Sequence, residues 1–106
     1  MTGNKLEGLL GMCRRAGRLV IGFDAVVNLC RAERATVMVA TDISKRTLKE
    51  LRFHLPQQTV YRLPLTKDQT AGALGLLKPT AVIATADEGF SKAMLCYVEE
   101  ESHYDD

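Results

Sequence analysis

Two continuous strand-like runs, residues 37–40 and 81–85, most constrain what this 106-residue chain can fold into. Consecutive apolar residues are typical of strands buried on both faces, whereas half-buried strands alternate apolar and polar positions. A shorter apolar run predicts a further strand at 19–21, and residues 60–63 are expected to form another. Segments with helical spacing of apolar residues lie around these strands, and we expect helices at residues 4–16, 24–33, 45–54, 67–74 and 88–99.

This alternation of helix and strand favours an α/β fold, a three-layer α/β/α sandwich around a small mixed sheet. The length fits a single domain, residues 1–106, whose core needs neither disulfide nor metal. Asn4, with Glu7 three residues later, and Ser44 are expected to cap their helices. The tail, from about residue 100 and especially from Ser102, is expected to be frayed.

The cellular setting is predicted from what the sequence lacks. No apolar run approaches the ~20 residues of a membrane span, and no charged head followed by an apolar run opens the chain. We therefore expect a cytoplasmic protein with no membrane partner. Cys13, Cys30 and Cys96 form no CxxC pair and are expected to be reduced thiols on core faces, so no metal site and no cofactor is expected.

Charge is distributed unevenly along the chain. Residues 1–53 hold ten Lys and Arg against five Asp and Glu, a net +5, while residues 54–106 hold four against eight, a net −4. These halves give the total of +1. A basic front half fits a polyanionic partner, although a solvated charged surface explains the same pattern.

The segment from residue 14 to residue 27 concentrates the features that suit phosphate binding. Arg14, Arg15 and Arg18 precede a short strand, and Gly22 then turns the chain into a helix. We expect the positive end of that helix to lie beside the arginines, where amides, helix dipole and cations favour an anion. Lys45 and Arg46, which open the next helix, are secondary candidates.

Motifs of the common enzyme classes are missing from the sequence. It contains no GxGxxG after a strand, no P-loop, no GxSxG and no HExxH. Asp42 and Asp87 each follow a central strand, which is where α/β enzymes keep catalytic carboxylates. Helix capping is the alternative interpretation. Because no histidine lies near either carboxylate in sequence, we expect no enzyme.

Three strings in this order resemble bacterial members of the ribosomal protein family of the L-seven-Ae / L-thirty-e type. Together they cover roughly residues 5–98. The strings are GMCRRAGRLVxG at residues 11–22, AxVMVAxD at residues 35–42 and AVIAxxDxGF at residues 81–90. The resemblance implies an α/β/α sandwich that binds structured RNA, in particular kink-turns, in which tandem sheared G·A pairs lie beside a sharp bend.

The family signature is Gly-x-Asn-Glu at the start of the second helix, with a basic residue about one turn later. By position, Gly22 matches the glycine and Phe23 the variable residue. Asp24 stands for the asparagine, Ala25 for the glutamate and Asn28 for the basic residue. Ala25 has no acceptor, and Asp24 accepts but cannot donate. The sequence therefore departs from the family where contacts to guanine edges are made, each typically worth about 1–3 kcal/mol.

The resemblance also implies a second RNA-facing loop before the last central strand, in which apolar groups pack against a flipped-out base. Here that loop corresponds to Leu77, Lys78, Pro79 and Thr80, and an ordinary turn would equally explain Lys78 and Pro79. Phe23 is either a core plug or a base-stacking platform.

We expect a ribosome-associated RNA-binding protein that binds structured, kink-turn-like RNA, acts as a monomer and performs no catalysis. Ribosomal RNA is one candidate for that target. The alternative is a protein-interaction module of the same fold that has lost kink-turn specificity, motivated by Asp24 and Ala25 and by the acidic C-terminal run.

Overall fold

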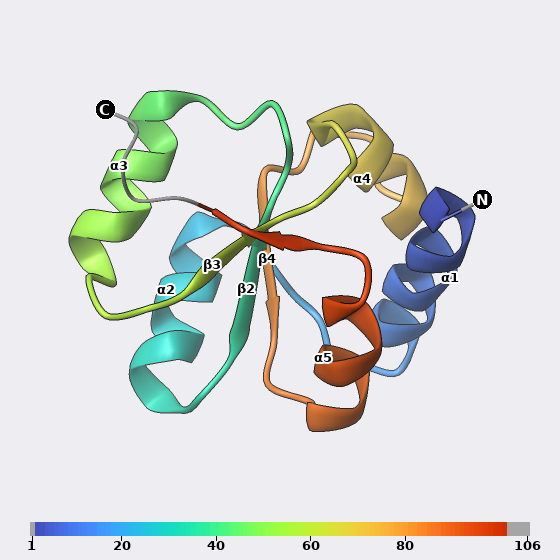
Figure 1. Ribbon diagram of the computed structural model, residues 1–106, viewed down its shortest axis with the longest axis horizontal. Coiled ribbons are helices and arrows are strands. Elements are labelled where there is room, and N and C mark those ends of the chain that lie inside the picture. The colour runs from blue at the N-terminus through green and yellow to red at the C-terminus, as the bar shows by residue number, and fades with distance from the viewer. Residues whose placement is uncertain (1, 102–106) are drawn as a thin grey trace.

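The computed structural model describes residues 2–101, with side chains from Lys5 onward. One five-stranded sheet, in the order β1-β4-β2-β3-β5, lies between two layers of helices (Figure 1). The elements in chain order are α1 (Thr2–Arg15), β1 (Val20–Ile21), α2 (Phe23–Ala32), β2 (Thr36–Val39), α3 (Lys45–His54), β3 (Val60–Arg62), α4 (Lys67–Leu74), β4 (Val82–Thr85), α5 (Glu88–Leu95) and β5 (Glu99–Glu100). The predicted α/β sandwich is confirmed.

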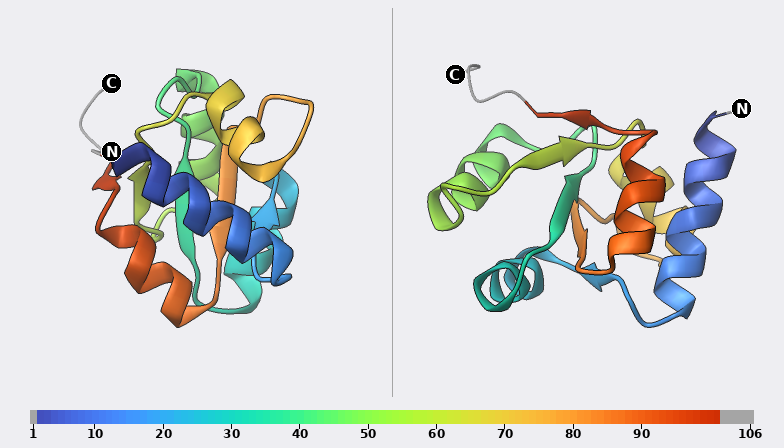
Figure 2. Two further views of the ribbon diagram at one scale, coloured as in Figure 1. Left: turned by 90° about the vertical axis from the view of Figure 1, so that its right-hand side faces the viewer. Right: turned by 60° about the horizontal axis from the view of Figure 1, so that its bottom comes forward.

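The helices divide between the two faces of the sheet. α2 and α3 cover one face, and α1, α4 and α5 cover the other (Figures 1 and 2). The central strands serve both cores because their side chains alternate between faces. In β4, Val82 and Ala84 pack with the α2 and α3 residues, whereas Ile83 packs with those of α1, α4 and α5. This two-sided burial is the reason that the apolar runs are continuous.

Strand directions place two sets of loops at opposite edges of the sheet. β2 is parallel to β3 and antiparallel to β4, and β1 is antiparallel to β4. β1, β2 and β3 therefore all end at one edge, where β4 begins. We call it the carboxyl edge; it contains Gly22, residues 40–42, residues 65–67 and Thr80. The opposite edge, which contains Arg18, Thr85 and Asp87, is called the amino edge.

Side-chain caps fix the starts of three helices. The hydroxyls of Ser44 and Thr66 accept from the N–H groups of Thr47 and Gln69, both at 3.1 Å, and Asp87 caps α5. The predicted cap at Asn4 is wrong, because α1 begins at Thr2. None of the described helices is long and apolar enough to cross a bilayer.

The C-terminal segment differs from the sequence expectation. The last helix ends at Leu95, and Glu99–Glu100 add an edge strand, β5, antiparallel to β3. Glu101 is buried, and its carboxylate accepts two hydrogen bonds from Arg62, from Nε at 2.6 Å and from Nη2 at 2.9 Å. Residues 99–101 are therefore held in place, whereas the expectation for the tail from Ser102 lies outside the described residues.

Candidate nucleic-acid interface

The start of α2 lies open at the carboxyl edge. Gly22 has φ 104° and ψ 152°, a conformation that residues with a Cβ rarely adopt. Its N–H donates to the Val82 carbonyl oxygen at 2.9 Å, which ties it to the sheet, and its carbonyl oxygen accepts from Val26. Gly22 has no side chain that could cap the helix. The N–H groups of the first turn, at Phe23, Asp24 and Ala25, therefore have no carbonyl partner within α2.

The residues that follow the glycine divide between core and solvent. Asp24, Ala25 and Asn28 are exposed on one side of α2. Phe23 is half-buried and packs against the core cluster of α2 and α3, and its ring meets the His54 ring edge-on, with centroids 5.8 Å apart. Phe23 thus helps to fix the helix start, which is the core role considered for it.

The loop before β4 lies next to this helix start. Gly22 is hydrogen-bonded to Val82, and Val82 is the first residue of β4, directly after the loop. Leu77 is fully exposed, and Lys78 and Pro79 are exposed beside it. Thr80 is buried; its N–H donates to Lys67 O at 3.1 Å and its hydroxyl to Lys78 O at 3.2 Å. The hydrogen bonds of Thr80 therefore fix the base of the loop. The exposed part of the loop presents the apolar Leu77 and the cation of Lys78 to solvent. Leu77 belongs to the loop that the family resemblance identifies, and the structure shows that its side chain is the exposed apolar tip of that loop.

The starts of α3 and α4 complete the carboxyl edge. The Asp42 carboxylate, in the turn that follows β2, accepts from the Lys67 N–H at 2.8 Å, so it helps to cap α4. Lys45 and Arg46 are exposed in the first turn of α3, and Arg46 pairs with Glu50 at 3.6 Å. Surface pairs of this kind contribute little to stability and leave the cation free to exchange partners.

The predicted arginine cluster is divided by the fold. Arg14 is exposed in part, but its Nη1 donates to the Leu74 carbonyl oxygen at 2.7 Å, at the end of α4 where the Leu77 loop begins. A cation suits the carbonyl-rich end of a helix. Arg15, also exposed, has its guanidinium beside Gly11 on α1. Arg14 therefore borders the end of α4, whereas Arg15 lies along its own helix.

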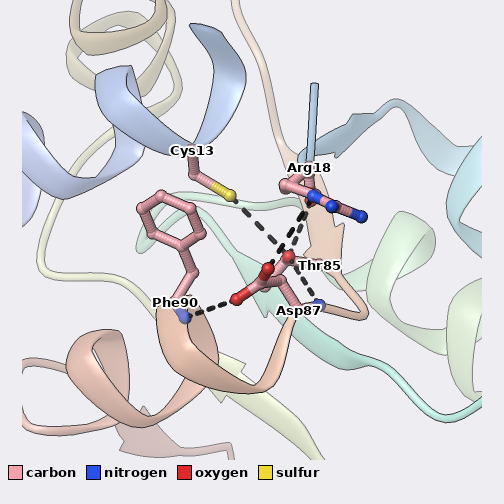
Figure 3. Close-up of polar contacts among 5 residues, drawn as sticks. All are labelled: Cys13, Arg18, Thr85, Asp87 and Phe90. Atoms are coloured by element: carbon pink, nitrogen blue, oxygen red, sulfur yellow. Dashed lines mark hydrogen bonds and ion pairs between the residues drawn. The ribbon is translucent and has the colours of Figure 1, made fainter. Parts of the chain in front are cut away.

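Arg18 lies at the amino edge, not beside the start of α2 as the sequence led us to expect. Its carbonyl oxygen accepts from the Thr85 hydroxyl at 2.6 Å, and its Nε is 3.8 Å from an Asp87 carboxylate oxygen (Figure 3). The extended chain rises about 3.3 Å per residue, so four residues separate Arg18 from Gly22 by about 13 Å. The physical reason is that β1 carries the chain from one edge of the sheet to the other.

The two candidate catalytic carboxylates are also at opposite edges. Asp42 follows β2 at the carboxyl edge, whereas Asp87 follows β4, which runs the other way, at the amino edge. Asp87 accepts from the Phe90 N–H at 2.9 Å and so caps α5 (Figure 3). Each carboxylate has a capping role, and the two cannot act on one substrate as an acid and base pair.

The cysteines are less uniform than predicted. Cys13 is buried and its thiol is 3.7 Å from the Thr85 hydroxyl, Cys30 is half-buried, and Cys96 is exposed because α5 ends before it. Burial raises the pKa of Cys13 and of Cys30 above the ordinary thiol value. Within the part of the chain that the structure describes, no three His, Cys, Asp or Glu side chains gather in a way that could hold a metal ion.

Comparison with known proteins points to one group of relatives. The chain is 28% identical over 103 residues to RNA-binding protein YlxQ of Bacillus subtilis (strain 168), covering 93% of this chain and all of that one. It is 29% identical over 93 residues to RNA-binding protein YlxQ of Enterococcus faecium, covering 83% and 85%. A solved structure of a protein with unknown function from Bacillus halodurans C superposes with a TM-score of 0.75 at 27% identity, covering 87% of this chain and 94% of that one. No family model matches the chain.

Proposed function

We propose that this protein binds structured RNA through its carboxyl edge and performs no catalysis. The names of its YlxQ relatives support RNA as the partner, and the alignments with these relatives cover 93% and 83% of this chain. The three strings noted above favour membership of the L-seven-Ae / L-thirty-e family. By analogy with that family, we propose that this protein is a cytoplasmic, ribosome-associated monomer. Its proposed target is a kink-turn-like element, such as one in ribosomal RNA.

The open first turn of α2 is the observation that carries this proposal. Three N–H groups, at residues 23–25, point out of a helix start that Gly22 leaves uncapped. A phosphate of the RNA backbone fits there, since the helix dipole and the amides both favour an anion. Lys78 supplies a cation from the adjacent loop.

The tip of the loop before β4 would make an apolar contact with the RNA. Leu77 and Pro79 are exposed apolar groups on a loop whose base is fixed by Thr80. An unstacked base packed on them would bury apolar surface that no protein atom covers in the free chain. The loop and the helix start together would clamp a bent RNA backbone and one extruded base.

Discrimination among RNAs depends on Asp24, Ala25 and Asn28. All three are exposed on α2, so they can reach base edges beside a bound phosphate. Asn28 donates and accepts, Asp24 only accepts, and Ala25 does neither. We therefore propose kink-turn binding with a smaller preference for the sheared G·A pairs than an Asn-Glu pair would give.

Titration of a kink-turn RNA and of a control with disrupted G·A pairs, each at two salt concentrations, tests the proposal. We expect binding to both RNAs, weakening steeply with salt, with a modest preference for the intact kink-turn. Absence of RNA binding above that of a neutral protein would overturn the proposal and favour the protein-interaction module.

A further inference from the structure

We propose that an unpaired nucleotide of the bound RNA binds at the cleft between α2 and α3, with its base stacked on Phe53, which lies beside the cleft next to His54. This inference rests on the proposed function and adds a second contact, outside the carboxyl edge, for single-stranded RNA. With this second contact, the protein would bind a structured RNA element together with an unpaired strand that flanks it.

A row of three rings is the first observation. The His54 ring is edge-on to Phe23, with centroids 5.8 Å apart and planes at 80°, and edge-on to Phe53 at 5.5 Å and 81°. Phe23 is anchored in the core, but Phe53 is 81% exposed at the end of α3. The row therefore begins in the core and ends in an aromatic side chain open to solvent. Such rings are the usual stacking platforms for unpaired bases.

A cleft of suitable size and chemistry adjoins the row. Its volume is about 350 Å³, and it is lined by Phe23, Asp24, Val27, Asn28, Arg31 and His54. That volume lies at the lower end of the range for small-ligand sites and suits a single nucleotide. The Asn28 amide can donate to and accept from a base edge. Arg31, whose Nη2 is 3.5 Å from His54 Nδ1, places a cation at the wall of the cleft.

Charge and position identify the occupant. The exposed charges of α3 are Lys45, Arg46 and Lys49 against Glu50, a net +2, and they attract a phosphate backbone. Arg52 is half-buried, and its Nη2 donates to the Glu101 carbonyl oxygen at 3.1 Å. Phe23 and Asp24 belong both to the open first turn of α2 and to the cleft. An RNA strand whose phosphate is held at that turn is therefore delivered directly to the cleft.

The test compares a blunt kink-turn RNA with the same RNA carrying a five-nucleotide unpaired extension at either end. Stacking of one base is worth about 1–3 kcal/mol, so we expect one extension to tighten binding by about fivefold or more. In Phe53→Ala this gain should fall below about twofold, because the platform is removed. The matched control is Met12→Ala, a half-exposed apolar side chain between α1 and α5, which should keep the gain.

Crosslinking then locates the strand. Extensions that carry 5-iodouridine should crosslink to the peptide that contains Phe53 and His54. Circular dichroism checks that Phe53→Ala is folded, which we expect because its ring is exposed. If the blunt RNA binds but neither extension adds affinity, or the gain survives in Phe53→Ala, the cleft inference is wrong while the proposed function stands. If neither RNA binds, both are wrong.

Discussion

Replacing Gly22 by alanine should destabilise the protein through backbone conformation alone. A Cβ built at this position meets no atom within 4 Å, so steric overlap with neighbours contributes nothing. The cost comes from φ 104° and ψ 152°, a region that is essentially restricted to glycine. Holding a residue in such a region costs about 1–3 kcal/mol. We therefore expect Gly22→Ala to lower the free energy of unfolding by that amount.

Urea unfolding followed by circular dichroism measures this change, and Gly72→Ala is the matched control. Gly72 lies inside α4, where an added Cβ also meets nothing within 4 Å but φ is not positive. Alanine should stabilise that helix by about 0.5–1 kcal/mol. The two identical chemical changes are thus predicted to have opposite signs.

RNA affinity provides the second half of the prediction. If alanine forces Gly22 out of its observed conformation, the N–H groups of residues 23–25 move, and binding should weaken even where the variant is folded. Gly72→Ala should bind as the wild type does. A Gly22→Ala protein as stable as the wild type, with unchanged affinity, would show that the reasoning about this helix start is wrong.

Three other predictions concern separate parts of the molecule. Glu101→Ala should lower the free energy of unfolding by about 1.5–3 kcal/mol in urea titrations, because the Arg62 guanidinium loses both of its hydrogen bonds to the buried carboxylate; an unchanged midpoint would contradict this. Iodoacetamide at pH 8, followed by mass spectrometry, should label Cys96 well before Cys13, whose thiol is buried and has a raised pKa; equal rates would contradict it. Leu77→Ala should leave stability unchanged, since the side chain is fully exposed, yet weaken RNA binding by about fivefold in fluorescence titrations; unaltered binding would exclude the loop tip as a contact.

The central strands were predictable because burial on both faces leaves a direct mark on the sequence. Residues 37–40 and 81–85 correspond to β2 and β4 within one residue at each end. Ser44 was predictable as a helix start, since a hydroxyl before a helical segment satisfies its first N–H groups locally.

The separation of Arg18 from Gly22 was predictable, because the strand expected at residues 19–21 already lies between them; the pairing of β1 with β4 confirms that they lie at opposite edges. Features that depend on distant partners were not predictable. The strand β5 is a pair of glutamates, a composition that argues against a strand. It forms because the Glu101 carboxylate pairs with Arg62 and because the Glu101 N–H donates to the Val60 carbonyl oxygen at 2.7 Å.

Charge reversal at the two edges of the sheet tests the central claim most directly. Lys78→Glu changes the carboxyl edge, and Lys92→Glu makes the same change on exposed α5, beside the cavity at the amino edge. Titrating a kink-turn RNA into both variants at moderate salt, we predict that Lys78→Glu weakens binding by about fivefold or more, with a shallower salt dependence, and that Lys92→Glu binds within about twofold of the wild type. Equal loss in both variants, or loss in Lys92→Glu alone, would contradict an RNA interface at the carboxyl edge.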